Sequence, residues 1–205
     1  MPVQRGYRQA CGIARGLDIV GERWSLLTVR ELLLGPKRFT DLQKALPAAS
    51  PNALSDRLRE LSEAGVIRRR QLPPPARAQV YELTPWGRGL EPIVVALGTW
   101  ALAAPPTADQ VFVSADSAML AIRTYFEPAP DQQEAVLRIE LGDQVFGVRV
   151  TRVGAEVTHE PPDNPDAILR ATTDTLLAAL GGDDLAGLTI DGNTDPVRRL
   201  LAAVH

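Results

Sequence analysis

The chain contains 205 residues, of which 45% are hydrophobic and 23% charged, and its formal net charge is −3, so one large or two small domains can form. Its single cysteine excludes an intrachain disulfide and a cysteine-based metal cluster. The first residues lack an apolar signal segment, and the longest apolar run, near Ile93 to Ala104, is too short to span a bilayer. We therefore expect a soluble, cytoplasmic protein with no membrane partner.

Two helices are expected early in the chain. The run from Arg23 to Leu34 is apolar almost all round, which predicts a central buried helix. Thr40 is predicted to cap a short helix over Asp41 to Leu46, with Phe39 and Leu42 packing inward.

A third helix follows after a tight turn. Ser50 is a good N-cap, Pro51 suits the first helical position, and Gly65 marks the end. Leucines at helical spacing predict the face that packs on a core: Leu54, Leu58 and Leu61. The other face offers donors and acceptors for base edges or phosphates: Asn52, Ser55, Asp56 and Arg59. Taken alone, this pattern also fits an ordinary amphipathic surface helix.

A two-stranded wing is predicted next. Val66 to Leu72 and Gln79 to Leu83 are strand-like, and a proline-rich loop, Pro73 to Ala78, joins them. Three arginines are expected to point outward, the last of them near the loop tip: Arg68, Arg70 and Arg77. A guanidinium there suits a phosphate or a narrow minor groove. A solvated hairpin is the alternative, but the order helix, turn, helix, wing favours a module that reads double-stranded DNA.

A helix from Pro85 toward Ala103 is predicted to form a dimer interface. Pro92 should kink this helix or split it in two. Its apolar stripe is larger than a small winged domain needs for its own core: Leu90, Ile93, Val94, Leu97 and Trp100. The stripe predicts a homodimer that places two recognition helices about one helical turn apart on DNA. Packing against a second domain is the alternative for part of the stripe.

The charge of the chain changes at Pro105 and Pro106. Residues 1–104 contain 15 Lys and Arg against 9 Asp and Glu, a formal charge of +6, whereas the remainder has 7 against 16, a charge of −9. Phosphate neutralisation by Lys and Arg supplies sequence-independent DNA affinity. We therefore expect a DNA-binding and dimerisation domain at 1–104 and a different domain, which stays off the duplex, at 105–205.

The second domain is predicted to be α+β, with an antiparallel sheet covered by helices. The expected strands are Val111–Val113, Ala135–Leu141, Gln144–Val150, Ala155–His159, one within AILR (Ala167–Arg170), and Leu188–Ile190. The expected helices are Asp116–Phe126, one from Thr173 and one from Asp195.

No catalytic or metal-binding motif is found. The two histidines, His159 and His205, have no partner at a fixed spacing, and GxGxxG, HExxH and GxSxG are absent from the sequence. The segment from Asp191 to Asp195 imitates the opening of a calcium loop, but Pro196 occupies the place that needs glycine. We predict that the protein is not an enzyme and holds no cofactor or metal.

The first half of the chain, Cys11 to Trp100, resembles the HxlR-type winged helix-turn-helix regulators, relatives of the MarR group. The likeness is carried, in order, by GERW, LLLGP, RFTDL, SPNALSDRLREL, AGVI and YELTPWG. It implies a homodimeric, bacterial-type transcription regulator, with Ser50 to Glu63 as recognition helix and Val66 to Leu83 as wing. Relatives often carry a larger or basic residue at the place of Ala53, so the likeness gives no operator sequence.

Cys11 has two interpretations. Some members of the HxlR-type family sense oxidants through a cysteine at this N-terminal place, so Cys11 is a redox candidate if it is exposed. The alternative, which we favour at this stage, is a small buried packing residue, because free cysteine is among the most buried residue types.

The segment from Gln110 to Val204 resembles the sterol carrier protein type-two fold. The likeness rests on DAILRATTDTLLAAL and LTIDGNTDPVRRLL, and it implies an apolar tunnel between helices and sheet. The candidate lining residues are Met119, Phe126, Ile139, Phe146, Val148, Leu176, Leu177 and Leu200. A filled core is the alternative.

Two functions follow. The first is a homodimeric DNA-binding transcription regulator that responds to a hydrophobic small-molecule effector bound in the second domain. The alternative is a carrier or accessory protein for lipids or other hydrophobic ligands, with the winged helix as a vestigial module.

Overall fold

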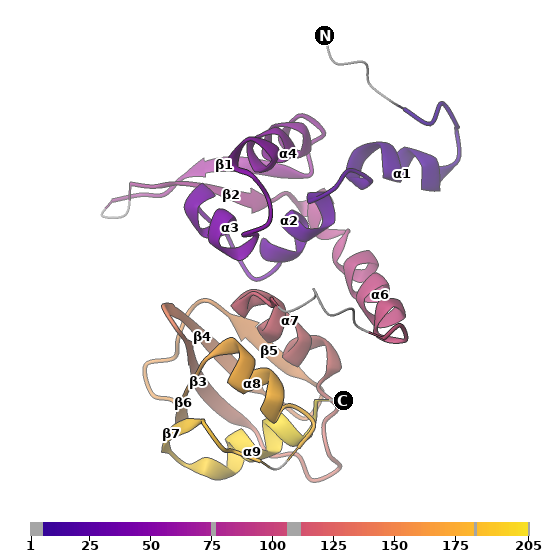
Figure 1. Ribbon diagram of the computed structural model, residues 1–205. Helices are drawn as coiled ribbons and strands as arrows, with labels where there is room; N and C mark the ends of the chain where they lie inside the picture. Colours follow the sequence, from indigo (N-terminus) through magenta and orange to yellow (C-terminus); the bar gives the residue numbers. More distant parts are fainter. Residues whose placement is uncertain (1–5, 75–76, 106–111, 183, 205) are drawn as a thin grey trace. The chain divides into compact units, whose positions relative to one another are not determined.

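The chain divides into two units in the computed structural model, which describes residues 6–74, 77–105, 112–182 and 184–204. Unit 1 spans Met1–Pro105 and unit 2 spans Pro106–His205. Figure 1 shows the helices and the wing of unit 1 and the sheet with its helices in unit 2.

Unit 1 is a helical domain with a β-hairpin. Its helices are α1 (Gly12–Val20), α2 (Ser25–Glu31), α3 (Phe39–Ala45), α4 (Pro51–Glu63), α5 (Pro85–Arg88) and α6 (Glu91–Leu102), and its strands are β1 (Ile67–Gln71) and β2 (Gln79–Leu83). The largest fully buried side chains of its core are Leu32, Leu42, Leu54, Leu58, Leu61 and Ile67. The leucine stripe predicted for the third helix is therefore confirmed.

The helix predicted from Arg23 to Leu34 is wrong in its length and in its character. Only Ser25–Glu31 is helical, because Trp24 before it adopts a left-handed backbone with φ 75°. Leu27 is exposed, whereas two polar residues at helical spacing, Ser25 and Thr28, are fully buried. Unit 1 thus buries polar groups within a run that was expected to be apolar almost all round, although the predicted burial is confirmed at Val29 and Leu32.

The caps of α3 and α4 show one error and one success. Helix α3 begins at Phe39 rather than after Thr40, because the carboxylate of Asp41 accepts a hydrogen bond from the backbone N–H of Arg38 at 3.2 Å. Ser50 caps α4 as predicted, and its hydroxyl accepts from the N–H of Ala53 at 3.2 Å.

The wing pairs β1 with β2 in antiparallel register. Ile67 lies opposite Leu83 and Gln71 opposite Gln79, so the predicted strands are confirmed to within one residue. Lys37 adds a short bridge to the wing, since its N–H donates to the carbonyl of Tyr81 at 3.0 Å and its carbonyl accepts at 2.8 Å. The segment between α2 and α3 is thereby fixed to the second strand of the wing.

The predicted break in the last helix of unit 1 is confirmed. The chain forms α5 and then α6, and Pro92 lies in the first turn of α6, where its missing N–H costs no intrahelical bond. Thr84 caps α5. Gly87 is required there because a Cβ would overlap the carbonyl oxygen of Val66.

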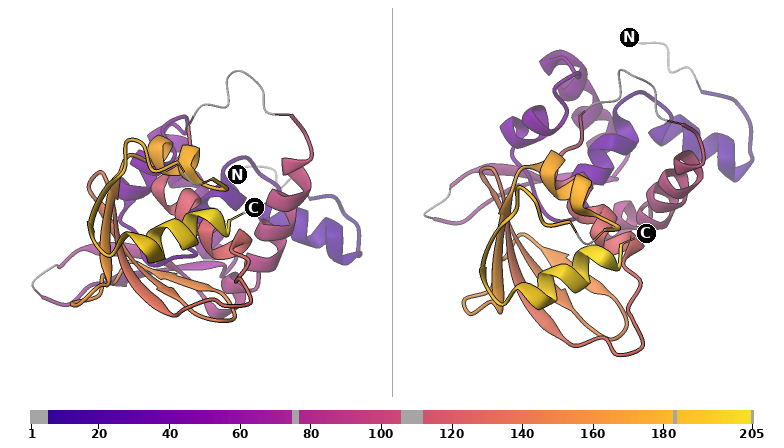
Figure 2. Two further views of the ribbon diagram at one scale, coloured as in Figure 1. Left: turned by 90° about the horizontal axis from the view of Figure 1, so that it is seen from below. Right: turned by 60° about the horizontal axis from the view of Figure 1, so that its bottom comes forward.

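Unit 2 has a five-stranded sheet in the order β5-β4-β3-β6-β7. The strands are β3 (Ala135–Leu141), β4 (Gln144–Val150), β5 (Ala155–Thr158), β6 (Ala167–Ala171) and β7 (Thr189–Gly192), and the helices are α7 (Ala115–Tyr125), α8 (Thr173–Ala179) and α9 (Thr194–Ala202). Figure 2 shows these helices on one face of the sheet. Alternate residues of β3 are buried, as expected for a sheet covered on one side.

The antiparallel sheet predicted for unit 2 is confirmed for three strand pairs and wrong for the fourth. Strand β6 pairs with β3 in parallel, with Leu137 opposite Ala167, so the sheet is mixed. Parallel pairing requires a crossover connection between the two strands. The segment between β5 and β6 passes close to β4, where a Cβ on Gly147 would overlap the carbonyl oxygen of Glu160. The strand predicted at Val111–Val113 is also wrong for Phe112 and Val113, while Val111 lies outside the described residues.

Among the described residues, no helix combines the length and the apolar character that crossing a bilayer requires.

Candidate nucleic-acid interface

The polar face of α4 is open to solvent. All its predicted DNA-contacting residues are exposed: Ser50, Asn52, Ser55, Asp56 and Arg59. The guanidinium of Arg59 forms an ion pair with Asp56 at 2.8 Å and lies 3.9 Å from Glu63. With about half of its side chain exposed, Arg59 can exchange these weak surface pairs for an anion.

On the wing, a single carboxylate binds two of the predicted DNA-contacting arginines. Arg68 Nε lies 2.7 Å from Glu82 Oε1, and Arg70 Nε lies 2.7 Å from Glu82 Oε2. The side chains of Arg68 and Arg70 are 63% and 43% exposed, whereas that of Glu82 is 11% exposed. We call these three residues the wing cluster. The wing cluster was not expected from the sequence, although Arg68 lies directly opposite Glu82 in the register of the wing.

The electrostatics of the wing cluster favour an ionised Glu82. Burial by itself would raise the pKa of the carboxyl, but hydrogen bonds from Arg70 and then Arg68, together with their charges, outweigh burial. The pKa of Glu82 therefore lies below its ordinary value. The two exposed guanidinium groups are therefore hydrogen-bonded to a carboxylate that is largely buried.

Arg77 lies near the tip of the wing with a positive φ of 38°. Its carbonyl accepts a hydrogen bond from the amide of Gln71 at 2.6 Å, and its side chain is exposed. Pro75 and Ala76, part of the predicted proline-rich loop, lie outside the described residues. On the described part of the loop, an exposed arginine is therefore held by its backbone while its guanidinium faces solvent.

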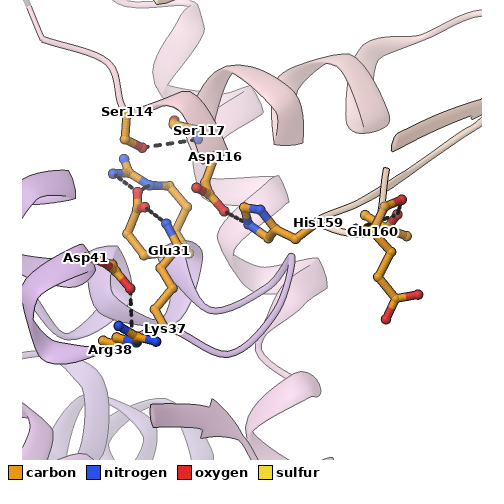
Figure 3. Close-up of polar contacts among 11 residues, drawn as sticks. Glu31, Lys37, Arg38, Asp41, Ser114, Asp116, Ser117, His159 and Glu160 are labelled. Carbon is orange, nitrogen blue, oxygen red and sulfur yellow. Dashed lines mark hydrogen bonds and ion pairs between the residues drawn. The ribbon is translucent and has the colours of Figure 1, made fainter. Parts of the chain in front are cut away.

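A buried ion cluster joins the end of α2 to the segment that follows it (Figure 3). Glu31 is fully buried, and its carboxylate receives Arg30 Nη2 at 2.7 Å and Lys37 Nζ at 2.9 Å. A buried carboxylate is tolerated only when it is paired and hydrogen-bonded, which these contacts provide. Since the backbone of Lys37 bridges to Tyr81, the cluster links α2 to β2. The sequence analysis missed this cluster, whose only signal was a charged residue within an apolar run.

The predicted dimer stripe lies on a largely exposed helix. No residue of α6 is buried, and Ile93, Leu97 and Trp100 are 54%, 45% and 76% exposed. An apolar groove of about 550 Å³ lies beside this helix, lined chiefly by residues of α1, α5 and α6. Helix α1, which the sequence analysis did not anticipate, adds Ile13, itself 78% exposed. The dimer interface predicted for this stripe stays a prediction, and the apolar side chains that it would cover are exposed.

Cys11 is exposed, so the interpretation as a buried packing residue is wrong. The reason is its position as N-cap of α1, where its Sγ accepts a hydrogen bond from the N–H of Ala14 at 3.3 Å. A cap position at the start of a surface helix leaves the thiol in solvent. Its role as a redox residue stays a prediction.

Unit 2 contains its own polar contacts. His159 Nε2 lies 2.7 Å from the fully buried carboxylate of Asp116 (Figure 3). The centre of the imidazole ring lies 4.6 Å from that of the Phe146 ring. On the outer face of the sheet, Glu140 lies 2.7 Å from Arg138 and 2.9 Å from Arg170. His205 lies outside the described residues. Within the described parts of the chain, no group of three His, Cys, Asp or Glu residues could hold a metal ion.

The residues predicted to line a tunnel in unit 2 lie in its core. All except Leu177 are buried: Met119, Phe126, Ile139, Phe146, Val148, Leu176 and Leu200. A hollow of about 670 Å³ in the described part of this unit is lined by other residues, a polar loop at 128–134 and Arg152. The tunnel itself stays a prediction.

Comparison with known proteins shows which family the sequence of unit 1 matches. Residues 19–107 match the model of the HxlR-like helix-turn-helix family. The chain is 41% identical over 88 residues to the HTH-type transcriptional regulator YvaP of Bacillus subtilis strain 168, which covers 42% of this chain and 81% of YvaP. This chain belongs to the HxlR-like helix-turn-helix family.

Another relative and one solved structure are also similar to part of this HxlR-like chain. The HTH-type regulator YdeP of Bacillus subtilis strain 168 is 36% identical over 95 residues, 45% of this chain and 72% of YdeP. The structure of the redox regulator HypR in its oxidized form is 29% identical, covers 47% of this chain and 100% of that chain, and gives a TM-score of 0.44. The family match ends at residue 107, so it includes α4, the wing and α6 but none of the elements of unit 2.

Proposed function

We propose that this HxlR-like protein is a DNA-binding transcription regulator that acts as a homodimer. The observation that carries the proposal is the exposure of two polar surfaces of unit 1, the polar face of α4 and the arginine-bearing wing, within a segment that matches the family model. A helix with exposed donors at its N-terminal half fits the major groove, and an arginine-bearing wing fits the adjoining backbone or minor groove.

Charge supports the assignment of DNA contact to unit 1. Residues 1–104 carry a formal charge of +6 and the remainder −9. Lys and Arg that neutralise phosphates release condensed counterions, and this release drives the sequence-independent part of binding. An acidic unit 2 would be repelled by the same phosphates.

The DNA-binding proposal is tested by a mobility-shift assay on the non-coding DNA immediately upstream of the gene. We expect binding in the nanomolar range that weakens steeply as salt rises, and that exceeds binding to a random duplex by at least about a thousandfold. Binding that is weak and equal for both duplexes would remove the proposal.

We assign the dimer contact to the exposed apolar side chains of α6 and the groove beside it. A partner helix would cover Ile93, Leu97 and Trp100, which are otherwise in water. Substitution of Leu97 by Asp is expected to convert the dimer to a monomer in light scattering after gel filtration, since a buried unpaired carboxylate is costly. Val153→Asp, at a residue of unit 2 that is 91% exposed, is the matched control and should leave the dimer intact.

The proposal includes an effector bound in unit 2, among predicted lining residues that are buried in its core except Leu177. Native mass spectrometry of protein purified from its host measures the retained ligand and the subunit count together. A hydrophobic ligand retained by the dimer supports the effector role. A ligand-free dimer that binds DNA would restrict the function to the winged helix.

A further inference from the structure

The register of the wing places one glutamate between two arginines. Glu82 lies directly opposite Arg68, while Arg70 is opposite Val80, and residues two apart on a strand share a face. The carboxylate therefore faces both guanidinium groups and gives one oxygen to each, at 2.7 Å in both cases. Arg69, between them in sequence, points to the other face, where it stacks 5.4 Å from the ring of Tyr81.

The geometry leaves both guanidinium groups able to bind an anion. Each arginine uses its Nε–H for Glu82, and a guanidinium has five N–H donors in a fixed planar fork. The carboxylate is largely buried, whereas the side chains of Arg68 and Arg70 are 63% and 43% exposed, so the guanidinium groups extend into solvent from a fixed carboxylate. The conformational freedom that a flexible arginine loses on binding has already been lost on folding.

Simple electrostatics makes the opposite prediction for Glu82. A carboxylate on the basic wing reduces the formal charge of the cluster from +2 to +1, which weakens attraction to phosphate at long range. If charge alone governed binding, removal of this carboxylate would tighten every DNA complex. If the fixed geometry of the arginines governs binding, removal would weaken the specific complex.

We propose that Glu82 is a positioning residue for DNA recognition, which holds Arg68 and Arg70 as a pre-arranged pair of phosphate-binding forks. This inference rests on the proposed DNA-binding function. Phosphate contacts of fixed geometry set the register of a protein on the duplex, so the pair contributes to the specific complex. Non-specific complexes, in which the register varies, gain little from the pre-arrangement.

The test compares E82Q with E140Q in the full-length protein. Both substitutions remove one carboxylate from between two arginines, and E140Q does so in unit 2. The probes are a duplex of about 30 base pairs selected by the unmodified protein from a randomised pool, and a random duplex of the same length. Fluorescence anisotropy over a salt series measures both affinities, and thermal unfolding confirms that each variant is folded.

For E82Q we expect about tenfold weaker binding to the selected duplex and unchanged or tighter binding to the random duplex. E140Q should change neither affinity by more than about twofold. Equal or tighter binding of E82Q to the selected duplex would overturn the inference in favour of simple charge repulsion. Equal weakening of both probes would overturn it in favour of a merely structural role.

A second pair of variants keeps the test independent of the folding of E82Q. R70K preserves the charge but lacks the planar fork, and R69K makes the same change on the opposite face of the wing. R70K should weaken binding to the selected duplex severalfold more than R69K does. Equal effects would contradict the inference. If the unmodified protein shows no preference for the selected duplex, the proposed function itself fails, which is a separate outcome.

Discussion

The two units of this protein contain the same arrangement of one glutamate between two arginines. In unit 1 it is Glu82 with Arg68 and Arg70 of one strand, and in unit 2 it is Glu140 with Arg138 and, from the parallel neighbouring strand, Arg170. The carboxylates differ in exposure, 11% for the side chain of Glu82 against 23% for that of Glu140.

The two clusters differ more in the charge of the domain around them than in their own contacts. The first arrangement lies on the wing of a domain with a formal charge of +6, and the second on the outer face of a sheet in a segment with a charge of −9. A cluster of this kind therefore does not by itself indicate DNA contact. The domain that presents it, and the charge of that domain, decide whether an approaching phosphate is attracted.

The largest expected effect is a loss of folding stability, and it distinguishes the core of unit 1 from that of unit 2. Leu58 and Leu137 are fully buried, one in α4 and one in β3. Each substitution by Ala should lower the free energy of unfolding of its unit by about 2 to 5 kcal/mol, because methyl groups are lost and a cavity remains. Calorimetry and DNA binding measure the outcome. L58A should reduce both stability and binding, and L137A only stability. Loss of DNA binding in L137A would show that the comparison between units is wrong.

An intermediate effect is expected for surface arginines. Arg59→Ala should cost about 1 to 3 kcal/mol of binding free energy on the selected duplex and relax sequence preference, because the helix face reads base edges. Arg77→Ala should weaken selected and random duplexes alike. Arg170→Ala in unit 2 is the control and should leave both affinities unchanged. Identical profiles for the Arg59 and Arg77 variants, measured by anisotropy, would contradict the assignment of helix and wing to different parts of the duplex.

The smallest effect concerns acid stability. Hydrogen bonds from Arg138 and Arg170 also hold the pKa of Glu140 below its ordinary value, as the arginines of the wing do for Glu82. A carboxyl whose pKa is lowered on folding stabilises the folded state above the unfolded pKa, and this contribution is lost as the pH falls through the folded pKa. For both clusters the loss should begin near pH 4.5, the ordinary glutamate value, and continue below it.

Thermal unfolding from neutral pH to below pH 4 checks this. The stability difference between the unmodified protein and E82Q should be below about 1 kcal/mol at neutral pH and shrink in acid, and E140Q should show the same trend in unit 2. A difference that grows as the pH falls would have the wrong sign for a lowered pKa. If E82Q and E140Q lose stability equally in acid but only E82Q weakens DNA binding, the two clusters have the same electrostatics but different functions.

Much of the local structure was predictable from short stretches of sequence. The Ser50 cap with its leucine stripe, the two strands of the wing and the hairpin of β3 and β4 follow from residues close together in the chain. The candidate DNA-contacting residues of α4 were likewise found by helical spacing, and they are exposed. These features depend on backbone hydrogen bonds and on which side of an element is apolar, and a window of about ten residues contains that information.

The remaining features required the tertiary structure. The contact of His159 with Asp116 joins residues 43 apart, and that of Glu82 with Arg68 joins residues 14 apart. The parallel pairing of β6 with β3 was missed because strand alternation is the same for either direction.

What the sequence by itself determined is the winged helix, its charge and its family, because capping, periodicity and composition are properties of neighbouring residues. What only the tertiary structure decided is which charges are paired, which are free to meet a ligand, and that Glu31 is buried while Cys11 is exposed. The physical reason is that electrostatic energy and burial depend on distances across the fold, and these distances exist only once the elements have packed.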